Sequence, residues 1–227
     1  MTTSAETGRI RLAVVTGGHS YDVPNFHALF RALPEVDACV QHMDDFASSS
    51  EEVRTGYDLV LFYTMMLDGP TDEGLPWYSG KPKTALEALG ETDQGVVMLH
   101  HSLVAYRAWP RWREITGVAG GTFCDFKFDV PLHVEVTAAE HPITRGVAAF
   151  DVIDEIYDMD DADEEGNEVL LTVDYPKSMR TVAWTRTFRK SRVFCLQLGH
   201  DAKAWANPTF REVLSRGIAW CARRKLC

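Results

Sequence analysis

The first half of the chain alternates continuous apolar runs with segments of helical spacing. The strand-like runs cover residues 10–16, 36–43, 57–64 and 96–99, and the last is uninterrupted and bounded by Gly95 and His100. An uninterrupted apolar run rich in β-branched residues is typical of a strand buried on both faces of a parallel sheet. We therefore predict four strands here, with residues 96–99 as the pivotal one and residues 36–43 off-centre.

Helical spacing and end signals place helices after several of these runs. Asp22 is a plausible N-cap for a helix with Pro24 in its first turn, and Asn207 precedes the final helix at Pro208. A short helix is expected at 84–89. The segment 104–115 is expected to be helical with a kink or break at Pro110, because proline removes a backbone donor.

The second half of the chain is richer in predicted strands. These are residues 132–136, 150–159, 169–174, 181–185 and 192–198. Strands and helices that alternate in this way predict an α/β fold. We expect one domain over residues 1–227, with a flavodoxin-like, mostly parallel doubly wound sheet and a β-rich insertion before the last strand.

Histidines follow three of the predicted central strands. His19 comes after the first strand, His100 and His101 after the pivotal strand, and His200 with Asp201 after the last one. Ligands bind at the carboxyl ends of the strands in open α/β sheets. We therefore predict that His19, His101 and His200 lie in one cleft.

A carboxylate is expected beside these histidines. Glu155 is surrounded in sequence by the apolar residues Val152, Ile153, Ile156 and Tyr157. A carboxylate in such a setting usually has a partner or belongs to a site. We therefore take the following residues as candidates for acid–base catalysis: His19, His100, His101, Glu155, His200 and Asp201.

The same histidines could instead bind a metal ion. Three imidazoles with an open position would make a Lewis-acid site, so His19, His101 and His200 are candidate ligands of a divalent metal such as zinc. The spacing matches no local metal motif such as H-E-x-x-H. The cofactor is therefore left open between a divalent metal and none.

Glycines and aromatic residues near the strand ends are candidate substrate contacts. Gly17 and Gly18 permit close backbone approach to a ligand. The long, turn-rich segment 65–82 follows the third strand, and we expect it to act as a lid that carries Trp77 and Tyr78. The complete set of candidate contacts is Gly17, Gly18, Ser102, Trp77, Tyr78 and Trp205.

Charge and composition exclude some partners. The net charge of −10 arises in residues 151–168, which hold ten acids and no base, so the rest of the chain has 23 acids and 23 bases. Neither nucleic acid nor an anionic membrane is expected as a partner. With no apolar run long enough to span a bilayer and a polar N-terminus, we expect a cytoplasmic protein. The five cysteines include no C-x-x-C pair and are expected to be reduced.

Several stretches together resemble the trehalose-utilisation, or ThuA-like, family of the class I glutamine amidotransferase-like superfamily. They are Val15-Thr-Gly-Gly-His19, Val97-Met-Leu-His-His-Ser102, His141-Pro-Ile-Thr-Arg-Gly146, Asp154-Glu-Ile-Tyr157, Gln197-Leu-Gly-His-Asp201 and Trp205-Ala-Asn-Pro-Thr-Phe210. The resemblance implies a flavodoxin-like sheet and a role in carbohydrate metabolism. It does not imply glutaminase activity, because His100, His101 and Ser102 occupy the turn where amidotransferases carry a nucleophilic cysteine.

Three functions remain open from the sequence. The first is an enzyme that acts on a disaccharide or keto-sugar, as a hydrolase or isomerase. The second is a non-catalytic sugar-binding or regulatory protein. The third is a hydrolase with Ser102 as nucleophile, which is disfavoured because Ser102 lacks the G-x-S-x-G motif. In each case the partner is a small carbohydrate, and a homo-oligomer is left open.

Overall fold

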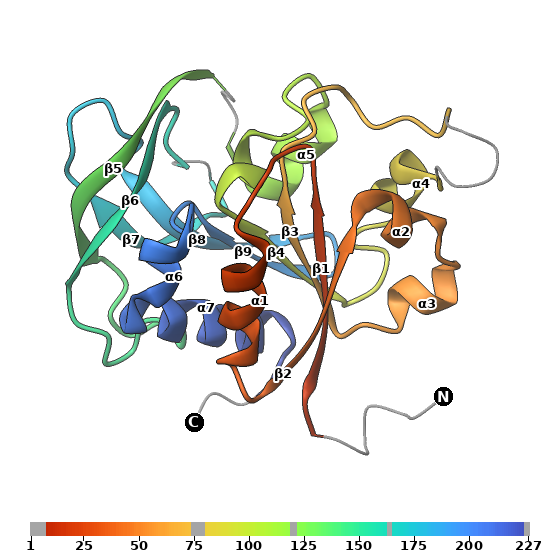
Figure 1. The fold of residues 1–227 in the computed structure, drawn as a ribbon, viewed down its shortest axis with the longest axis horizontal. Helices are drawn as coiled ribbons and strands as arrows, with labels where there is room; N and C mark the ends of the chain where they lie inside the picture. Colours follow the sequence, from red (N-terminus) through yellow and green to blue (C-terminus); the bar gives the residue numbers. More distant parts are fainter. Residues whose placement is uncertain (1–7, 74–79, 119–121, 163–164, 225–227) are drawn as a thin grey trace.

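The computed structural model describes residues 8–73, 80–118, 122–162 and 165–224. Within these residues nine strands form a single sheet in the order β2-β1-β3-β4-β9-β8-β7-β5-β6 (Figure 1). The strands are β1 (Ile10–Gly17), β2 (Val36–His42), β3 (Leu59–Thr64), β4 (Gly95–Leu99), β5 (Phe123–Val136), β6 (Phe150–Met159), β7 (Glu168–Val173), β8 (Thr181–Phe188) and β9 (Ser191–Leu196).

The sheet has a parallel half and an antiparallel half. The order β2-β1-β3-β4-β9 is parallel throughout and matches the flavodoxin-like order. From β9 onward every pairing is antiparallel. The expectation of a mostly parallel sheet is therefore correct for one half only. The physical reason is the turn at Arg189 and Lys190, which is too short to connect β8 to β9 in any but an antiparallel pair.

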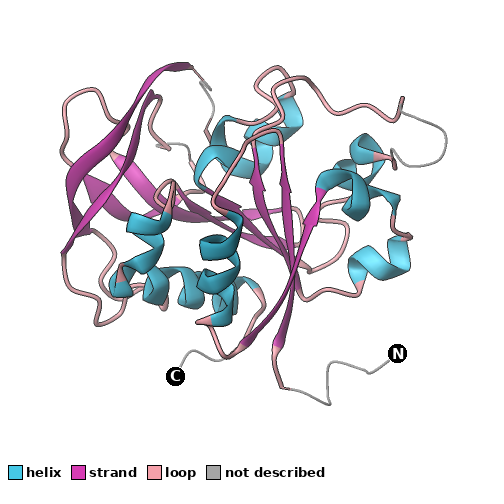
Figure 2. Cartoon of the chain, viewed as in Figure 1, coloured by secondary structure: helices cyan, strands magenta, loops and turns pink. Residues whose placement is uncertain are grey.

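Helices cover both faces of the parallel half (Figure 2). They are α1 (Val23–Arg31), α2 (Met43–Ser48), α3 (Glu51–Thr55), α4 (Pro82–Glu87), α5 (Pro110–Thr116), α6 (Ala202–Ala206) and α7 (Pro208–Cys221), with a 3₁₀ helix η1 (His100–Val104). Successive residues of β1 point to opposite faces, so that Leu12 and Val14 join one core cluster and Ala13 and Val15 the other. Helices α1 and α7 pack in the first cluster, and α2, α4 and α5 in the second.

The predicted helix starts and the predicted interruption at Pro110 are confirmed. Asp22 caps α1 by accepting a hydrogen bond from Asn25 N, and Asn207 caps α7. The segment 104–115 is broken rather than kinked: the 3₁₀ helix η1 ends at Val104, and α5 begins at Pro110. Proline is well suited to the first position of a helix, and the residue before it prefers an extended backbone. No helix in the described ranges is long and apolar enough to cross a membrane.

Candidate active site

Four histidines come together at the carboxyl edge of the parallel strands. His19 follows β1, His100 and His101 begin η1 directly after β4, and His200 follows β9. The ring centroids of His19 and His101 lie 4.6 Å apart, and those of His19 and His200 lie 6.3 Å apart. The strands bring these side chains together because their carboxyl ends meet at one edge of the sheet.

Glu155 joins the histidines from β6, the strand at the antiparallel edge of the sheet. It lies on β6, which with β5 forms a long hairpin that arches beside α6 (Figure 1). The hairpin is tied to the segment after β9 by the Asp154 carboxylate, which accepts hydrogen bonds from Gly199 N at 2.6 Å and from His200 N at 2.9 Å. The side-chain amide of Gln197 also donates to the Glu155 carbonyl at 2.8 Å. These bonds hold Glu155 in the cluster.

The hydrogen bonds of His100 define the charge state of the cluster. Its Nδ1 lies 2.6 Å from the Gln197 carbonyl oxygen, which can only accept, so Nδ1 carries a proton. Its Nε2 lies 2.8 Å from Glu155 Oε2, 2.8 Å from the Tyr157 hydroxyl and 3.2 Å from His200 Nδ1. With Nδ1 protonated, the Nε2 lone pair of a neutral ring can accept from the Tyr157 hydroxyl. A metal ion shared by Nε2 and Glu155 Oε2 would make their close approach favourable.

The buried carboxylates of the cluster differ in their ionisation. Burial alone would raise the pKa of Glu155, but the hydrogen bonds from His100 and His200 outweigh it and lower this pKa to about 2. Burial would lower the pKa of His200, yet its contact with Glu155 at 3.1 Å raises it overall. Burial raises the pKa of Asp154. Glu155 is thus the anionic centre of the cluster.

The backbone of His100 is strained. It has a φ of +54°, a left-handed conformation that is uncommon for residues other than glycine. Here a buried histidine holds that conformation at the sharp turn between β4 and η1. Strain of this kind persists where the surrounding structure enforces it, often at functional sites. The turn directs the His100 ring at Glu155 and His200.

Among the described residues, the group able to share one metal ion is His100, Glu155 and His200. Their ligand atoms all lie within 4.8 Å of one another. Of the expected ligands His19, His101 and His200, this group contains His200; a role of the other two in metal binding stays a prediction. The left-handed backbone of His100 turns its ring to Glu155 and away from that of His101. Their ring planes are 81° apart.

His101 and His19 line the cluster without belonging to that group. His101 is 2% exposed, and its two ring nitrogens have no hydrogen-bond partner among the described residues. Burial, together with the neighbouring His100 and His19, lowers the pKa of His101 to about 2. Burial also lowers the pKa of His19, whose side chain is exposed. Both rings are therefore neutral at neutral pH.

Three other predicted site residues have structural roles instead. Ser102 is buried, where its hydroxyl donates to the Phe62 carbonyl at 2.6 Å and accepts from Thr64 N at 3.0 Å. Trp205 is 2% exposed and packs in the core, so it cannot stack on a ligand. Asp201 caps α6 by accepting from Lys203 N at 2.8 Å. Packing buries the side chains of Ser102 and Trp205, so the structure offers no support for their predicted contact with a substrate.

The two glycines at the end of β1, Gly17 and Gly18, are required by the path of the chain. Gly18 has a φ of +73°, and a Cβ there would lie 2.7 Å from the backbone of Met65. A Cβ on Gly17 would lie 2.8 Å from His42 Nε2. Internal packing therefore accounts for both glycines, and their contact with a substrate stays a prediction. Trp77 and Tyr78 lie outside the described residues, so their expected role in a lid also stays a prediction.

Several residues that complete the site were given no role from the sequence. Tyr157, Asp154 and Gln197 hold the cluster, and Phe128 lies beside it with its ring centroid 4.9 Å from that of His200. The phenylalanines of β5 were detectable in principle, since Phe126 and Phe128 alternate with charged residues at the period of a strand. Asp154, Tyr157 and Gln197 stand in the stretches that carry the family resemblance, but their hydrogen-bond partners are set by the tertiary structure.

This chain was compared with protein families and with proteins of known structure. A family model described as "ThuA: Trehalose utilisation" matches residues 11–221. A putative ThuA-like protein from Bacteroides uniformis aligns with a TM-score of 0.72 at 20% identity, over 97% of this chain and 94% of that one. A putative ThuA-like protein from Parabacteroides merdae aligns with a TM-score of 0.71 at 18% identity, over 94% of this chain and 90% of that one. PurLQS from Thermotoga maritima aligns with a TM-score of 0.56 at 14% identity, over 93% of this chain and 99% of that one. A search of curated proteins finds no match.

Proposed function

Because the chain belongs to the ThuA, or trehalose-utilisation, family, we propose that it is an enzyme of carbohydrate metabolism that acts on a disaccharide or keto-sugar derivative. The reaction takes place at the cluster of His100, Glu155 and His200. The family supports the substrate class. The chemistry is argued from the cluster itself.

The observation that carries the proposal is the triangle formed by His100 Nε2, Glu155 Oε2 and His200 Nδ1. Its edges are 2.8, 3.1 and 3.2 Å. Two imidazoles and one carboxylate are a ligand set that divalent zinc or iron uses in catalytic sites. A metal-binding histidine typically donates its other N–H to a backbone carbonyl, as His100 does to Gln197. These residues therefore fit a divalent metal.

Bound there, a divalent metal would polarise a sugar carbonyl or hydroxyl, or lower the pKa of a water molecule. Glu155 balances the positive charge of the site. The exposed His19 is the group best placed to accept a proton from the substrate, because its lowered pKa keeps it neutral and its ring lies 6.3 Å from that of His200. His101, packed between His19 and Tyr63, supports the His19 ring.

We include in the proposal that the protein lacks glutaminase activity. His100 occupies the turn after β4 in which amidotransferases place their nucleophilic cysteine. In the described part of the chain, Cys195 and Cys221 are buried, and Cys39 and Cys124 lie on strands away from that turn. Burial raises the pKa of both buried thiols, which disfavours the reactive thiolate.

The test combines metal analysis with turnover. The wild-type protein, prepared without metal-affinity steps, is expected to contain close to one divalent metal ion per chain. His100→Ala and Glu155→Gln should lose both this metal and the turnover of trehalose or its keto derivative, measured by mass spectrometry. His133→Ala is the matched control, because His133 is an exposed histidine of β5 that pairs with Asp151.

Two results would count against the proposal in different ways. Sugar binding without any chemical conversion, in wild type and variants alike, would favour the non-catalytic alternative. Turnover that persists in metal-depleted protein but disappears in His19→Ala would favour acid–base chemistry without a metal.

A further inference from the structure

Strand β5 carries three phenylalanines whose rings are in contact and continue directly from the histidine cluster. Phe126 and Phe128 are 48% and 50% exposed. Their ring centroids lie 5.0 Å apart, and the ring of Phe123 lies 6.4 Å from that of Phe126. At the other end Phe128 lies 4.9 Å from the His200 ring. We call these three residues the aromatic wall.

The wall faces the site because of the register of the hairpin. Phe126 is paired with Tyr157, and paired residues project from the same face of a sheet. The Tyr157 hydroxyl contacts His100 Nε2 at 2.8 Å, and its ring lies 5.5 Å from that of Phe123. Phe128 follows Phe126 by two residues and so projects from the same face, and the irregularity in register between Phe123 and Asp125 brings Phe123 into line with both. Such bulges often redirect side chains next to active sites.

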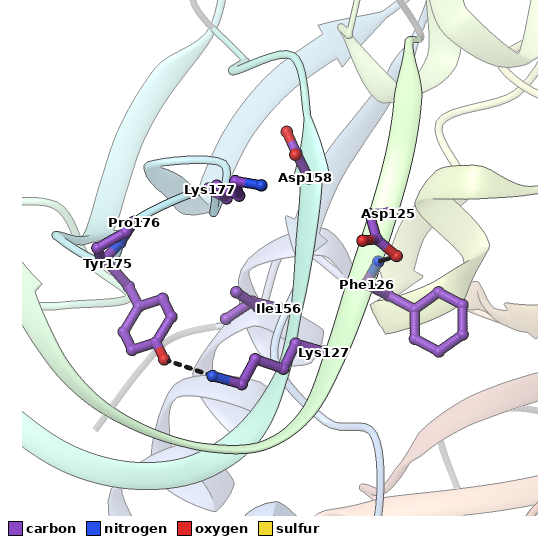
Figure 3. A pocket seen from close by; sticks show the side chains of 8 residues that line it. All are labelled: Asp125, Phe126, Lys127, Ile156, Asp158, Tyr175, Pro176 and Lys177. Atoms are coloured by element: carbon purple, nitrogen blue, oxygen red, sulfur yellow. Dashed lines mark hydrogen bonds between the residues drawn. The ribbon is translucent and has the colours of Figure 1, made fainter.

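The opposite face of the hairpin has a different character. It carries a separate cavity of about 270 Å³, where Lys127 donates to the Tyr175 hydroxyl at 3.0 Å (Figure 3). Phe126 is one of the residues that line the cavity, but in Figure 3 its ring lies on the other side of β5 from Lys127 and Tyr175. The aromatic wall therefore lies on the face of the hairpin that is directed toward His100 and His200.

The chemistry of the wall fits a sugar ring. Single exposed apolar residues are ordinary, but contacting aromatic rings beside a polar site are typical of ligand grooves. A pyranose presents a face of C–H groups that stacks on aromatic rings, while its hydroxyls need polar partners at the edge. Arg107 supplies donors there, since its guanidinium lies 4.3 Å from the centroid of Phe123 and is anchored by the Val104 carbonyl.

We propose that the aromatic wall binds the second sugar ring of a disaccharide by stacking, while the first ring lies at His100, Glu155 and His200. This inference rests on the proposed function. It identifies the substrate as larger than a monosaccharide, because Phe126 and Phe128 form a surface beyond the reacting centre. Phe128 is the residue that joins the two subsites.

Titration calorimetry with trehalose and with glucose tests the proposal on the full-length protein. Phe126→Ala and Phe128→Ala should each weaken trehalose binding by about tenfold, and Phe128→Tyr should restore it. Glucose binding and metal content should not change, because the first subsite is intact. Tyr175→Ala is the matched control, since it removes an aromatic ring from the other face of the hairpin. Thermal unfolding of each variant verifies that it is folded.

Three outcomes would overturn the inference. The first is equal trehalose affinity in wild type and in Phe126→Ala/Phe128→Ala, and the second is no trehalose binding by the wild type. The third is a double variant that only converts a dimer to a monomer in light scattering, which would make the wall an interface between copies of the chain. Failure of the proposed function has a separate signature: metal content and turnover that do not respond to His100→Ala.

Discussion

Replacing Glu155 by glutamine removes the carboxylate that both His100 and His200 contact. Glu155 is 5% exposed, so water screens these contacts little. Its pKa of about 2, against an ordinary value of 4.5, means that the ionised carboxylate contributes about 3 kcal/mol to folding in the metal-free protein. We therefore expect Glu155→Gln to unfold at neutral pH with a free energy about 3 kcal/mol lower than that of the wild type.

The pH dependence gives this prediction a sign that can be checked. The pKa of Glu155 is lowered on folding, so its contribution is fully present above pH 4.5 and is lost as the pH falls toward the folded pKa of about 2. Urea unfolding in the presence of a chelator, followed by tryptophan fluorescence, measures both proteins across this range. The difference between them should shrink below pH 4.5.

The same assay then tests metal binding. Zinc added at a hundred times its dissociation constant should stabilise the wild type by about 2.7 kcal/mol, and Glu155→Gln much less. Glu135→Gln is the control, because the Glu135 side chain is 62% exposed and its loss should change stability by no more than about 0.5 kcal/mol. Equal stability of wild type and Glu155→Gln in chelator, or a difference that does not vary with pH, would refute the reasoning.

Three further substitutions separate structural from functional roles. Ser102→Ala leaves the buried Thr64 N–H unpaired and should lower the unfolding free energy by about 1–3 kcal/mol. The folded variant should keep its turnover, and lost turnover at unchanged stability would indicate that Ser102 is a nucleophile. His101→Phe removes two buried ring nitrogens that have no partner in the described ranges and should raise the unfolding free energy by about 1 kcal/mol, so a marked loss in a urea titration would contradict it. Trp205→Phe should lower stability by about 1–3 kcal/mol and leave KM unchanged; a raised KM at constant Tm would instead make this ring a substrate contact.

The parallel half of the fold was predictable because its strands are buried on both faces. Strands β1, β3, β4 and β9 are almost entirely apolar, and such runs are visible in the sequence without any partner. Strand β5 was predicted only for its last residues. Its first half is exposed and mixes Phe126 and Phe128 with charged residues, so it lacks the apolar run that marks a buried strand.

The site was predictable as far as the strand ends define it. His19, His100, His101 and His200 lie together because the carboxyl ends of parallel strands meet. The roles of individual side chains were not predictable to the same degree. Ser102 and Trp205 occupy promising positions in the sequence, yet both point into the core. A side chain's direction depends on the backbone torsions at each turn, which packing determines.

By itself, the sequence determined the buried strands of the parallel half, where the glycine and proline boundaries lie, and which histidines follow central strands. These are local properties, set by the burial period and the backbone preferences of each residue. Only the tertiary structure decided that β6 arches back to bring Glu155 to His100, and that His100 rather than His101 faces it. Those contacts join residues 55 positions apart, and they depend on sheet curvature and on a strained turn that local preferences do not encode.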